Sequence, residues 1–288
     1  MCGICGKVNL NYARPIAPGE IEAMRDTMVS RGPDAGGLHV DRHAGLGHRR
    51  LSIIDLEASV QPMPNEDRSV WIVFNGEIYN FHELRQDLIA RGHRFRTAGD
   101  TETIVHAYEE YGTDCVNRLR GMFTFAIWDA RTDTLMLARD RVGVKPLYYT
   151  LNDQAFLFGS ELKSLVADEH FRATRQIDEE AVHSYLSFLS VPDPISIYRG
   201  VRKLPAGHIL TLQHGRITLH RYWNVSFEAQ EGISSEEWEA RVLDALQEAV
   251  KIRLVADVPL GAFLSGGVDS SAVVALMTRI MDRPVKTF

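Results

Sequence analysis

The second residue of the chain is a cysteine, and a cysteine in this position can be a nucleophile that carries its own base. Removal of Met1, which a small second residue permits, would leave Cys2 with its thiol beside a free α-amine. An α-amine titrates near about 7.7–8.0 and a thiol near about 8.5, so a minority of amines are neutral at pH 7 and can take the thiol proton. No histidine would be required. With Met1 attached, the same nitrogen is an amide and Cys2 should be inert.

Cys2 and Cys5 also fit the C-x-x-C pattern of thiol redox sites and, when doubled, of zinc sites. A redox pair is expected between a strand and a helix rather than at a chain end. Zinc would need a second pair, whereas Cys115 stands alone. A lone cysteine at position 2 is more often incidental than catalytic, so the interpretation depends on what the other residues supply.

Three further positions suit the recognition of a small polar molecule. Arg50 is the second of two adjacent arginines on an expected strand, so only one of the two can face a given pocket, and a guanidinium suits a bidentate grip on a carboxylate. Asn75-Gly76 follows a predicted strand and fits equally a tight turn or an oxyanion hole made by the asparagine amide and the glycine N–H. Asp100 or Thr101 could be no more than the N-cap of the next helix.

A glycine-rich loop runs from Ser265 to Ser271, between an apolar strand at 258–264 and a helix from residue 272 onward. Backbone N–H groups and a helix N-terminus in this arrangement form an anion site. The loop lacks the lysine of the G-x-x-x-x-G-K-[ST] phosphate loop, and a plain Gly-Gly turn is the alternative.

The elements that position these residues are predicted from periodicity, turn residues and capping signals. The predicted strands are 3–10, 48–55, 70–74, 121–128, 134–139, 147–151, 155–158, 207–212, 216–222 and 258–264. The predicted helices are 18–31, 80–91, a helix starting at 99–102, 161–167, 178–189, 234–254 and one from 272. Capping boxes are expected at Asn80 with Glu83 and at Ser234 with Glu237, and residues 31–37 are expected to be a turn-rich connector.

The length of 288 residues exceeds what one hydrophobic core usually covers, so two domains are expected. The segment 223–233 is polar and aperiodic and is the predicted linker. It separates strand-rich α+β material, residues 1–222, from a second domain, residues 234–288.

The composition is that of an ordinary globular chain, with 45% hydrophobic and 24% charged residues. A net charge of −6 with interspersed signs favours neither nucleic acid nor an anionic membrane as a partner. The sequence has no apolar run of membrane-spanning length and no targeting pattern at its start. Three cysteines are too few for a disulfide framework, which favours a cytoplasmic protein with reduced thiols.

Several motifs, taken together and in order, resemble those of the glutamine-hydrolysing asparagine synthetases. They are Met1-Cys2-Gly3-Ile4, Arg31-Gly32-Pro33-Asp34, residues 48–52 (HRRLS), residues 75–80 (NGEIYN), Gly99-Asp100-Thr101-Glu102 and residues 139–149 (RDRVGVKPLYY). The resemblance covers essentially the whole chain. It implies that residues 1–222 are a class II glutamine amidotransferase with the N-terminal-nucleophile hydrolase fold, a four-layer sandwich with two antiparallel sheets between helical layers. Residues 234–288 would begin an α/β parallel-sheet, ATP-dependent synthetase domain.

The resemblance also implies a role for each candidate residue of the first domain. Cys2 would attack the side-chain carbonyl of glutamine, and Asn75 with the Gly76 N–H would stabilise the oxyanion. A glutamyl thioester would form as ammonia leaves, and water would then release glutamate. Arg50 would hold the α-carboxylate of glutamine, and two acidic residues would hold its α-amine. The implied glutamine-binding set is Arg50, Leu51, Ile53, Asn75, Gly76, Glu77 and Asp100.

In this family the second domain adenylates a carboxylate, usually that of aspartate, with ATP and Mg²⁺, and ammonia from the first site displaces AMP. The resemblance implies that the glycine-rich loop contacts pyrophosphate, that Asp269 lies near the metal and that Leu264 lies by the nucleotide. The implied ATP-binding set is Leu264, Ser265, Gly266, Gly267, Asp269 and Ser270. The glutaminase half would need no cofactor.

The sequence stops at Phe288, where the second strand of a parallel sheet would begin, and such a sheet needs both faces covered. We therefore expect a truncated product that can hydrolyse glutamine but does not make asparagine by itself. Three alternatives are open: a family member that amidates another carboxylate in polysaccharide or antibiotic synthesis, a non-catalytic module that binds glutamine or a partner subunit, and a redox or zinc module. The oligomeric state, including a homodimer, is open as well.

Overall fold

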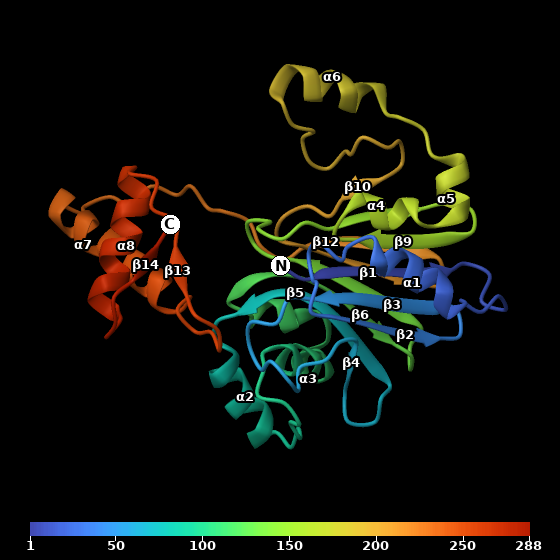
Figure 1. Ribbon diagram of the computed structural model, residues 1–288, viewed down its shortest axis with the longest axis horizontal. Helices are drawn as coiled ribbons and strands as arrows, with labels where there is room; N and C mark the ends of the chain where they lie inside the picture. Colours follow the sequence, from blue (N-terminus) through green and yellow to red (C-terminus); the bar gives the residue numbers. More distant parts are fainter. The chain divides into compact units, whose positions relative to one another are not determined.

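The computed structural model describes residues 1–288, which divide into two compact units, Met1–Asn224 and Val225–Phe288 (Figure 1). None of the helices combines the length and the apolar character that crossing a bilayer would require. The candidate residues for glutamine chemistry all lie in the first unit, and the glycine-rich loop lies in the second.

The first unit contains two six-stranded sheets in which every pair of neighbouring strands is antiparallel. The first sheet, in spatial order, consists of β10 (Arg202–Lys203), β8 (Tyr148–Leu151), β9 (Ala155–Gly159), β1 (Gly3–Asn9), β3 (Ala44–Arg50) and β2 (Ala35–Asp41). The second sheet consists of β12 (Arg216–Arg221), β11 (His208–Gln213), β7 (Thr134–Arg139), β6 (Gly121–Asp129), β5 (Val70–Ile78) and β4 (Met63–Pro64).

Three hydrophobic layers hold these sheets and their helices together. Side chains alternate across a strand, so Ile4 and Val8 of β1 pack between the sheets with Trp128, whereas Cys5 packs under helix α1 (Pro18–Asp26). The outer face of the first sheet is covered by α1, α4 (Leu162–Val166) and α5 (Glu169–Thr174). The outer face of the second sheet is covered by α2 (Phe81–Ala90), α3 (Thr101–Tyr111) and the 3₁₀ helix Gly112–Asn117.

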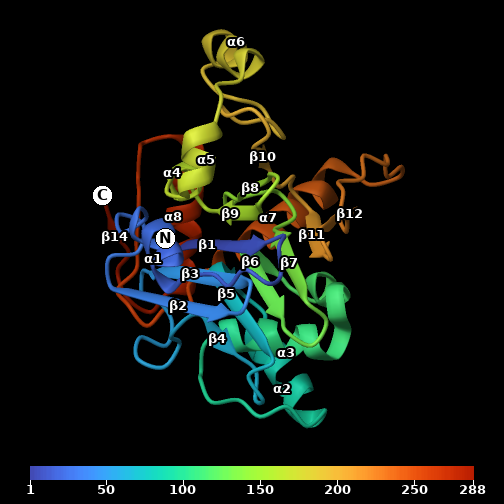
Figure 2. The same cartoon turned by 90° about the vertical axis from the view of Figure 1, so that its right-hand side faces the viewer.

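The order helix, sheet, sheet, helix is therefore the architecture of the first unit, and the predicted α+β fold with two antiparallel sheets is confirmed. In Figure 1 the helices α2 and α3 lie below the sheets and α4 and α5 lie above them, and Figure 2 shows the same layers from the side. Helix α6 (Glu179–Phe188) lies apart from these layers and exposes Leu186 and Phe188.

Two predicted segments near the candidate site are wrong. The strand expected at 48–55 is β3, which ends at Arg50, and the connector expected at 31–37 becomes strand β2 from Ala35. Gly37 explains the second error, because a Cβ there would lie 1.9 Å from the backbone oxygen of Gln61. A glycine is needed at position 37 for close packing within a strand and not for a turn.

The predicted capping box at Asn80 is also wrong. Asn80 precedes α2, but its side chain makes no cap hydrogen bond. Its amide instead donates to the Arg118 oxygen at 2.9 Å and accepts from the Arg120 N–H at 2.9 Å, which ties the helix start to the loop before β6. Ser234, by contrast, does cap its helix, since its hydroxyl accepts from the Glu237 N–H at 3.2 Å.

The second unit contains α7 (Ser235–Lys251), β13 (Gly261–Ala262), α8 (Val268–Ile280) and β14 (Lys286–Thr287). Its two strands pair in parallel around a small apolar cluster of Val250, Leu276 and Met277. The strand predicted at 258–264 is only two residues long, because β14 offers it only two paired residues.

Candidate active site around Cys2

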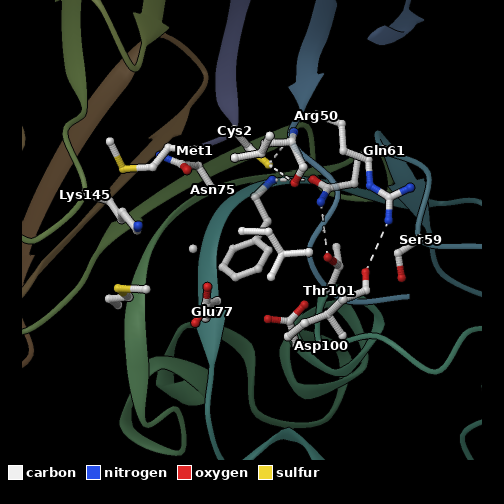
Figure 3. A pocket seen from close by; sticks show the side chains of 16 residues that line it. Met1, Cys2, Arg50, Ser59, Gln61, Asn75, Glu77, Asp100, Thr101 and Lys145 are labelled. Carbon is white, nitrogen blue, oxygen red and sulfur yellow. Dashed lines mark hydrogen bonds between the residues drawn. The ribbon is translucent and has the colours of Figure 1, made fainter. Parts of the chain in front are cut away.

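Every residue predicted to act on glutamine lines one cavity of about 200 Å³ in the first unit (Figure 3). Its lining consists of Met1, Cys2, Arg50, Leu51, Ile53, Ile54, Ser59, Gln61, Phe74, Asn75, Gly76, Glu77, Asp100, Thr101, Met122 and Lys145. These residues come from both sheets, from the loop after β3 and from the start of α3. The cavity suits a ligand the size of an amino acid rather than a nucleotide.

Cys2 lies at the start of β1, with its sulfur beside the backbone of Leu51. The Leu51 N–H donates to Sγ at 3.4 Å, and Sγ lies 3.6 Å from the Leu51 oxygen. Arg31 fixes the backbone here, because its Nε donates to the Cys2 oxygen at 2.9 Å. Burial raises the pKa of the Cys2 thiol, although the Leu51 N–H opposes the rise. A thiol in this environment is protonated at neutral pH, so it needs a base in order to react.

Cys5 has a different environment from Cys2. It is fully buried in the layer between β1 and α1, and all three cysteines of the chain are free thiols. Because the side chain of Cys5 points into this core while Cys2 lines the cavity, the two do not form a joint redox or zinc site.

The outer edge of β5 carries one unoccupied backbone donor that faces the cavity. The Phe74 N–H donates to Gln61 Oε1 at 2.6 Å, and the Ile78 N–H donates to Asp100 Oδ2 at 3.0 Å. Since alternate N–H groups of a strand point to the same edge, the N–H of Gly76 points this way too, between the other two. Of the two interpretations left open for Asn75-Gly76, the tight turn is therefore wrong, because both residues lie within β5 and pair with β6.

Asn75 provides a second donor beside Gly76. Its side chain is 1% exposed, and its amide nitrogen has no hydrogen-bond partner. A buried amide without a partner is uncommon in a folded protein and costs free energy. An oxygen atom of a ligand in the cavity would satisfy this donor, which is what an oxyanion hole requires.

Substitution of Gly76 by alanine is expected to lower both the melting temperature and the rate of glutamine hydrolysis. A Cβ at this position would lie 2.2 Å from the Met122 oxygen and 2.7 Å from the Phe123 Cα, so β5 must shift, at a cost of about 1–3 kcal/mol. Thermal unfolding and glutamate release measure the two effects. The matched control is Gly19→Ala on α1, where a Cβ meets nothing within 4 Å. An unchanged melting temperature and rate in Gly76→Ala would contradict the expectation.

Arg50 is the arginine of the pair that faces the cavity. The strand pattern predicted that only one of the two would do so, and the family resemblance pointed to Arg50. Its guanidinium is buried and donates to three backbone oxygens of the loop after β3, those of Ile54, Asp55 and Leu56. It forms no ion pair with a carboxylate, so its positive charge is available to an acidic ligand. Arg49 points to the other face, where its Nε donates to the Gly32 oxygen at 3.0 Å.

Asp100 precedes α3, but its carboxylate does not cap that helix. It accepts from the Ile78 N–H instead, so its interpretation as a plain N-cap is wrong. Burial raises the pKa of Asp100 to about 7, and the nearby carboxylate of Glu77 contributes to the rise. A cationic group bound between these two acids would stabilise their charged forms.

Lys145 is a cavity residue that the sequence analysis did not single out. It is 6% exposed and follows a loop organised by Asp140, whose carboxylate accepts from the N–H groups of Val144 and Lys145. Arg139 stabilises the same loop, because its Nε donates to the Lys145 oxygen at 2.8 Å. Burial lowers the pKa of Lys145, although Glu77 opposes the change. The motif at 139–149 contained the signal, but only the fold shows that this lysine reaches the cavity.

The glycine-rich loop of the second unit joins β13 to α8, as expected. Gly266 has a positive φ of 81°, and Gly267 is the N-cap of α8. The hydroxyls of Ser265 and Ser270 lie 3.1 Å apart across the loop. These two hydroxyls and the free N–H groups of the first turn of α8 are donors of the kind that bind phosphate oxygens. Asp269 follows in the first turn, and Leu264 pairs with the backbone of Phe288.

Two family models match the chain: "Glutamine amidotransferase domain" over residues 1–223 and "Asparagine synthase" over residues 241–288. Asparagine synthetase (glutamine-hydrolyzing) 1 of Bacillus subtilis is 42% identical over 280 residues, which cover 96% of this chain and 44% of the relative. Amidase chry2 of Gibberella zeae is 36% identical over 274 residues, which cover 93% of this chain and 40% of the relative. The chain spans about half the length of the curated relatives that it matches.

Solved structures of low sequence identity share the fold. The glutamine phosphoribosylpyrophosphate amidotransferase from B. subtilis superposes with a TM-score of 0.55 at 17% identity, and the match covers 100% of this chain and 65% of that one. A structure described as the allosteric regulatory enzyme of purine biosynthesis gives a TM-score of 0.57 at 16% identity, with 99% and 65% covered.

Proposed function

The chain belongs to the glutamine amidotransferases of the asparagine synthase family, and from this premise we propose that its first unit hydrolyses glutamine to glutamate and ammonia with Cys2 as the nucleophile. One observation carries the proposal: the thiol of Cys2 lines the same cavity as two unoccupied donors, the Asn75 amide and the Gly76 N–H. A nucleophile and an oxyanion hole around one cavity are what acyl transfer requires.

Met1 must be removed before catalysis, because its removal converts the nitrogen of Cys2 from an amide to an α-amine. The neutral amine takes the thiol proton while sulfur attacks the side-chain carbonyl carbon of glutamine. The carbonyl oxygen becomes negatively charged and accepts hydrogen bonds from Asn75 and Gly76. As the C–N bond breaks, the ammonium of Cys2 returns the proton to the leaving nitrogen, ammonia departs, and a thioester forms. Water then attacks the thioester with the same amine as base and releases glutamate.

The charges around the cavity match the two ends of an amino acid. Arg50, which has no carboxylate partner in the protein, would hold the α-carboxylate of glutamine together with backbone groups at Leu51 and Ile53. Glu77 and Asp100 would hold the α-ammonium group. With both ends fixed, the side chain of glutamine is directed to Cys2, which provides selectivity for one amino acid and one chain length.

The test is the intact mass of the purified protein before and after incubation with a diazo-ketone analogue of glutamine. We expect a chain that lacks Met1 and gains one adduct, which maps to Cys2 and is prevented by an excess of glutamine. A chain that retains Met1, or one that lacks Met1 but forms no adduct, would rule out the catalytic proposal and favour a module that only binds glutamine.

Glutamine binding is expected to weaken as the pH falls below about 7. The pKa of Asp100 in the free protein is about 7, so below this pH the carboxylate must lose a proton before it can pair with the α-ammonium of glutamine. The dissociation constant should then rise about tenfold for each pH unit. His48 does not contribute, because burial lowers its pKa to about 3 and it stays neutral.

Calorimetric titration of the Cys2→Ala variant from about pH 5.5 to about pH 8 measures this effect without turnover. Asp100→Asn in the same background should bind weakly at every pH, and its dissociation constant should not depend on pH in this range. Glu22→Gln, at an exposed position on α1, should keep the full pH dependence. A constant affinity with Asp100 intact would contradict the assignment.

For the second unit we propose that the loop from Ser265 to Ser270 binds the phosphates of ATP, with Asp269 toward Mg²⁺. The donor set of the loop fits phosphate oxygens. Bound ATP would supply the activation of an acceptor carboxylate, which the ammonia from the first unit would then amidate. Aspartate is the proposed acceptor because the relatives include asparagine synthetases, and a different carboxylate is the alternative because they also include amidases. Formation of AMP from ATP with a panel of carboxylic acids, measured with a protein that contains a whole synthetase domain, distinguishes the two.

A further inference from the structure

A second group of titratable side chains lies further along α3, apart from the glutamine cavity. It consists of Glu66 from the loop between β4 and β5, His93 from the loop after α2, and His106 and Glu109 from α3, and we call it the His–Glu cluster. One ligand atom of each residue lies within 4.8 Å of those of all the others. Neither the proposed glutaminase reaction nor the ATP loop uses any of these residues.

The spacing of these atoms matches a tetrahedral metal site. Zinc bonds to nitrogen and oxygen of about 2.0–2.1 Å place neighbouring ligand atoms about 3.3–3.4 Å apart at the corners of a tetrahedron. His106 Nδ1 lies 2.9 Å from Glu109 Oε2 and 3.4 Å from Glu66 Oε2. His93 Nδ1 lies 3.6 Å from Glu66 Oε1 and 3.9 Å from Glu109 Oε2. The two distances to Glu66 end on its two different oxygens, and the 2.9 Å contact is a hydrogen bond, so binding an ion requires loss of that proton and a shift of the side chains around one Glu66 oxygen.

Both histidines face a further carboxylate with the ring nitrogen that points away from the cluster. His106 Nε2 lies 3.7 Å from Glu102 Oε1, and His93 Nε2 lies 3.7 Å from Glu110 Oε2. His106 is 1% exposed, and its Nε2 has no hydrogen-bond partner. A histidine that ligates a metal typically donates its other ring N–H to such a carboxylate, which fixes the tautomer and orients the ring.

The two carboxylates of the cluster are also held in place by groups outside it. Asn65 Nδ2 donates to Glu109 Oε1 at 2.7 Å, which leaves Oε2 on the side of the histidines. The Arg94 N–H donates to Glu66 Oε1 at 3.0 Å. The cluster is reachable from solvent, because the side chains of Glu66 and His93 are 32% and 15% exposed. The ligands are thus oriented in advance and have an entry path.

We propose that the His–Glu cluster binds one divalent cation of the zinc class, with His93, His106, Glu66 and Glu109 as its ligands. Four protein ligands leave no position open for a substrate, so the ion has a structural role. It would join two loops to α3, the helix that begins beside Asp100 of the glutamine cavity. The alternative is that no metal binds and that His106 is protonated, so that its positive charge pairs with the surrounding carboxylates.

The experiment uses the full 288-residue chain with the substitution Cys2→Ala, because a terminal cysteine could bind zinc through its thiol and amine. The protein is stripped with a chelator, incubated with Zn²⁺ and gel-filtered, and its metal content and melting temperature are measured. We expect one equivalent of zinc per chain and a higher melting temperature. Co²⁺ should give the visible absorption bands of a tetrahedral site with nitrogen and oxygen ligands.

Matched variants locate the ion. His93→Ala and Glu109→Gln should each lose the bound equivalent and the cobalt spectrum. Glu110→Gln, which removes the carboxylate behind His93 together with its ion pair to Arg91, should weaken binding by roughly tenfold. The control His82→Ala, at an exposed position on α2, should bind as tightly as its parent. Less than one equivalent after gel filtration, or binding that survives both His93→Ala and Glu109→Gln, would overturn the proposal and leave His106 as the proton carrier of an ion-pair network.

Discussion

Glutamate release from glutamine is expected to fall at least about 10⁴-fold when Cys2 is replaced by alanine, because the variant lacks the nucleophile and cannot form the thioester. The fold should not change, since the sulfur contacts only the backbone of Leu51 within hydrogen-bond range. Glutamine should still bind, because Arg50 and Asp100 are untouched. Assays of glutamate release, covalent labelling and calorimetric binding measure these three outcomes separately.

The matched control for Cys2→Ala is Cys5→Ala. Cys5 is 0% exposed and packs under α1, so its truncation should lower the melting temperature through a small cavity and leave turnover near that of the parent. Equal losses of activity in the two variants would contradict the assignment of Cys2 as the only nucleophile. They would instead favour a chemistry that depends on both thiols.

Replacement of Asn75 by alanine should lower kcat by about 10²–10³-fold, which corresponds to roughly 3–4 kcal/mol of lost oxyanion stabilisation. KM should change little, because the amide interacts most strongly with a charge that develops only in the transition state. The melting temperature should stay the same or rise, since the Asn75 amide nitrogen has no partner in the free protein and its removal breaks no hydrogen bond.

Asn80→Ala is the informative control, because the two asparagines are expected to behave in opposite ways. The Asn80 side chain makes two hydrogen bonds to the backbone before β6 and does not line the cavity. Its truncation should therefore lower the melting temperature and spare kcat. If Asn75→Ala loses stability and activity in parallel, its role is structural, and the oxyanion assignment is wrong.

The sequence predicted the fold best where periodicity and burial agree. The strand 134–139 has the predicted bounds, and the neighbouring strand predicted at 121–128 extends one residue further, because alternating side chains pack on both faces of the second sheet. Several of the wrong predictions concern the local structure at glycine and asparagine residues. Asn75-Gly76 carries the signal of a turn, but long-range pairing with β6 keeps it in a strand, and only the tertiary structure contains that information.

The residues of the candidate site likewise include some that could be predicted from the sequence and some that could not. Alternation of side chains placed Arg49 and Arg50 on opposite faces of their strand, as the structure has them, but only the family resemblance indicated which of the two faces the cavity. Lys145 and Gln61 could not be found, since each lies in a loop whose path is set by hydrogen bonds to a strand. Asp140, which holds Lys145, accepts from the Phe123 N–H, and Gln61 accepts from the Phe74 N–H. The roles of Glu77 and Asp100 also depend on their meeting across two elements, which no local pattern encodes.

The outer edge of β5 also bears on the solubility of the protein. An exposed strand edge offers a row of N–H and C=O groups on which a strand of another molecule can add. Along this edge Val70 donates to Asn65, Ile72 pairs with β4, Phe74 donates to Gln61 and Ile78 donates to Asp100. Only the donor at Gly76 is left for a ligand, so the arrangement that leaves one N–H for the proposed oxyanion also prevents intermolecular strand addition along this edge.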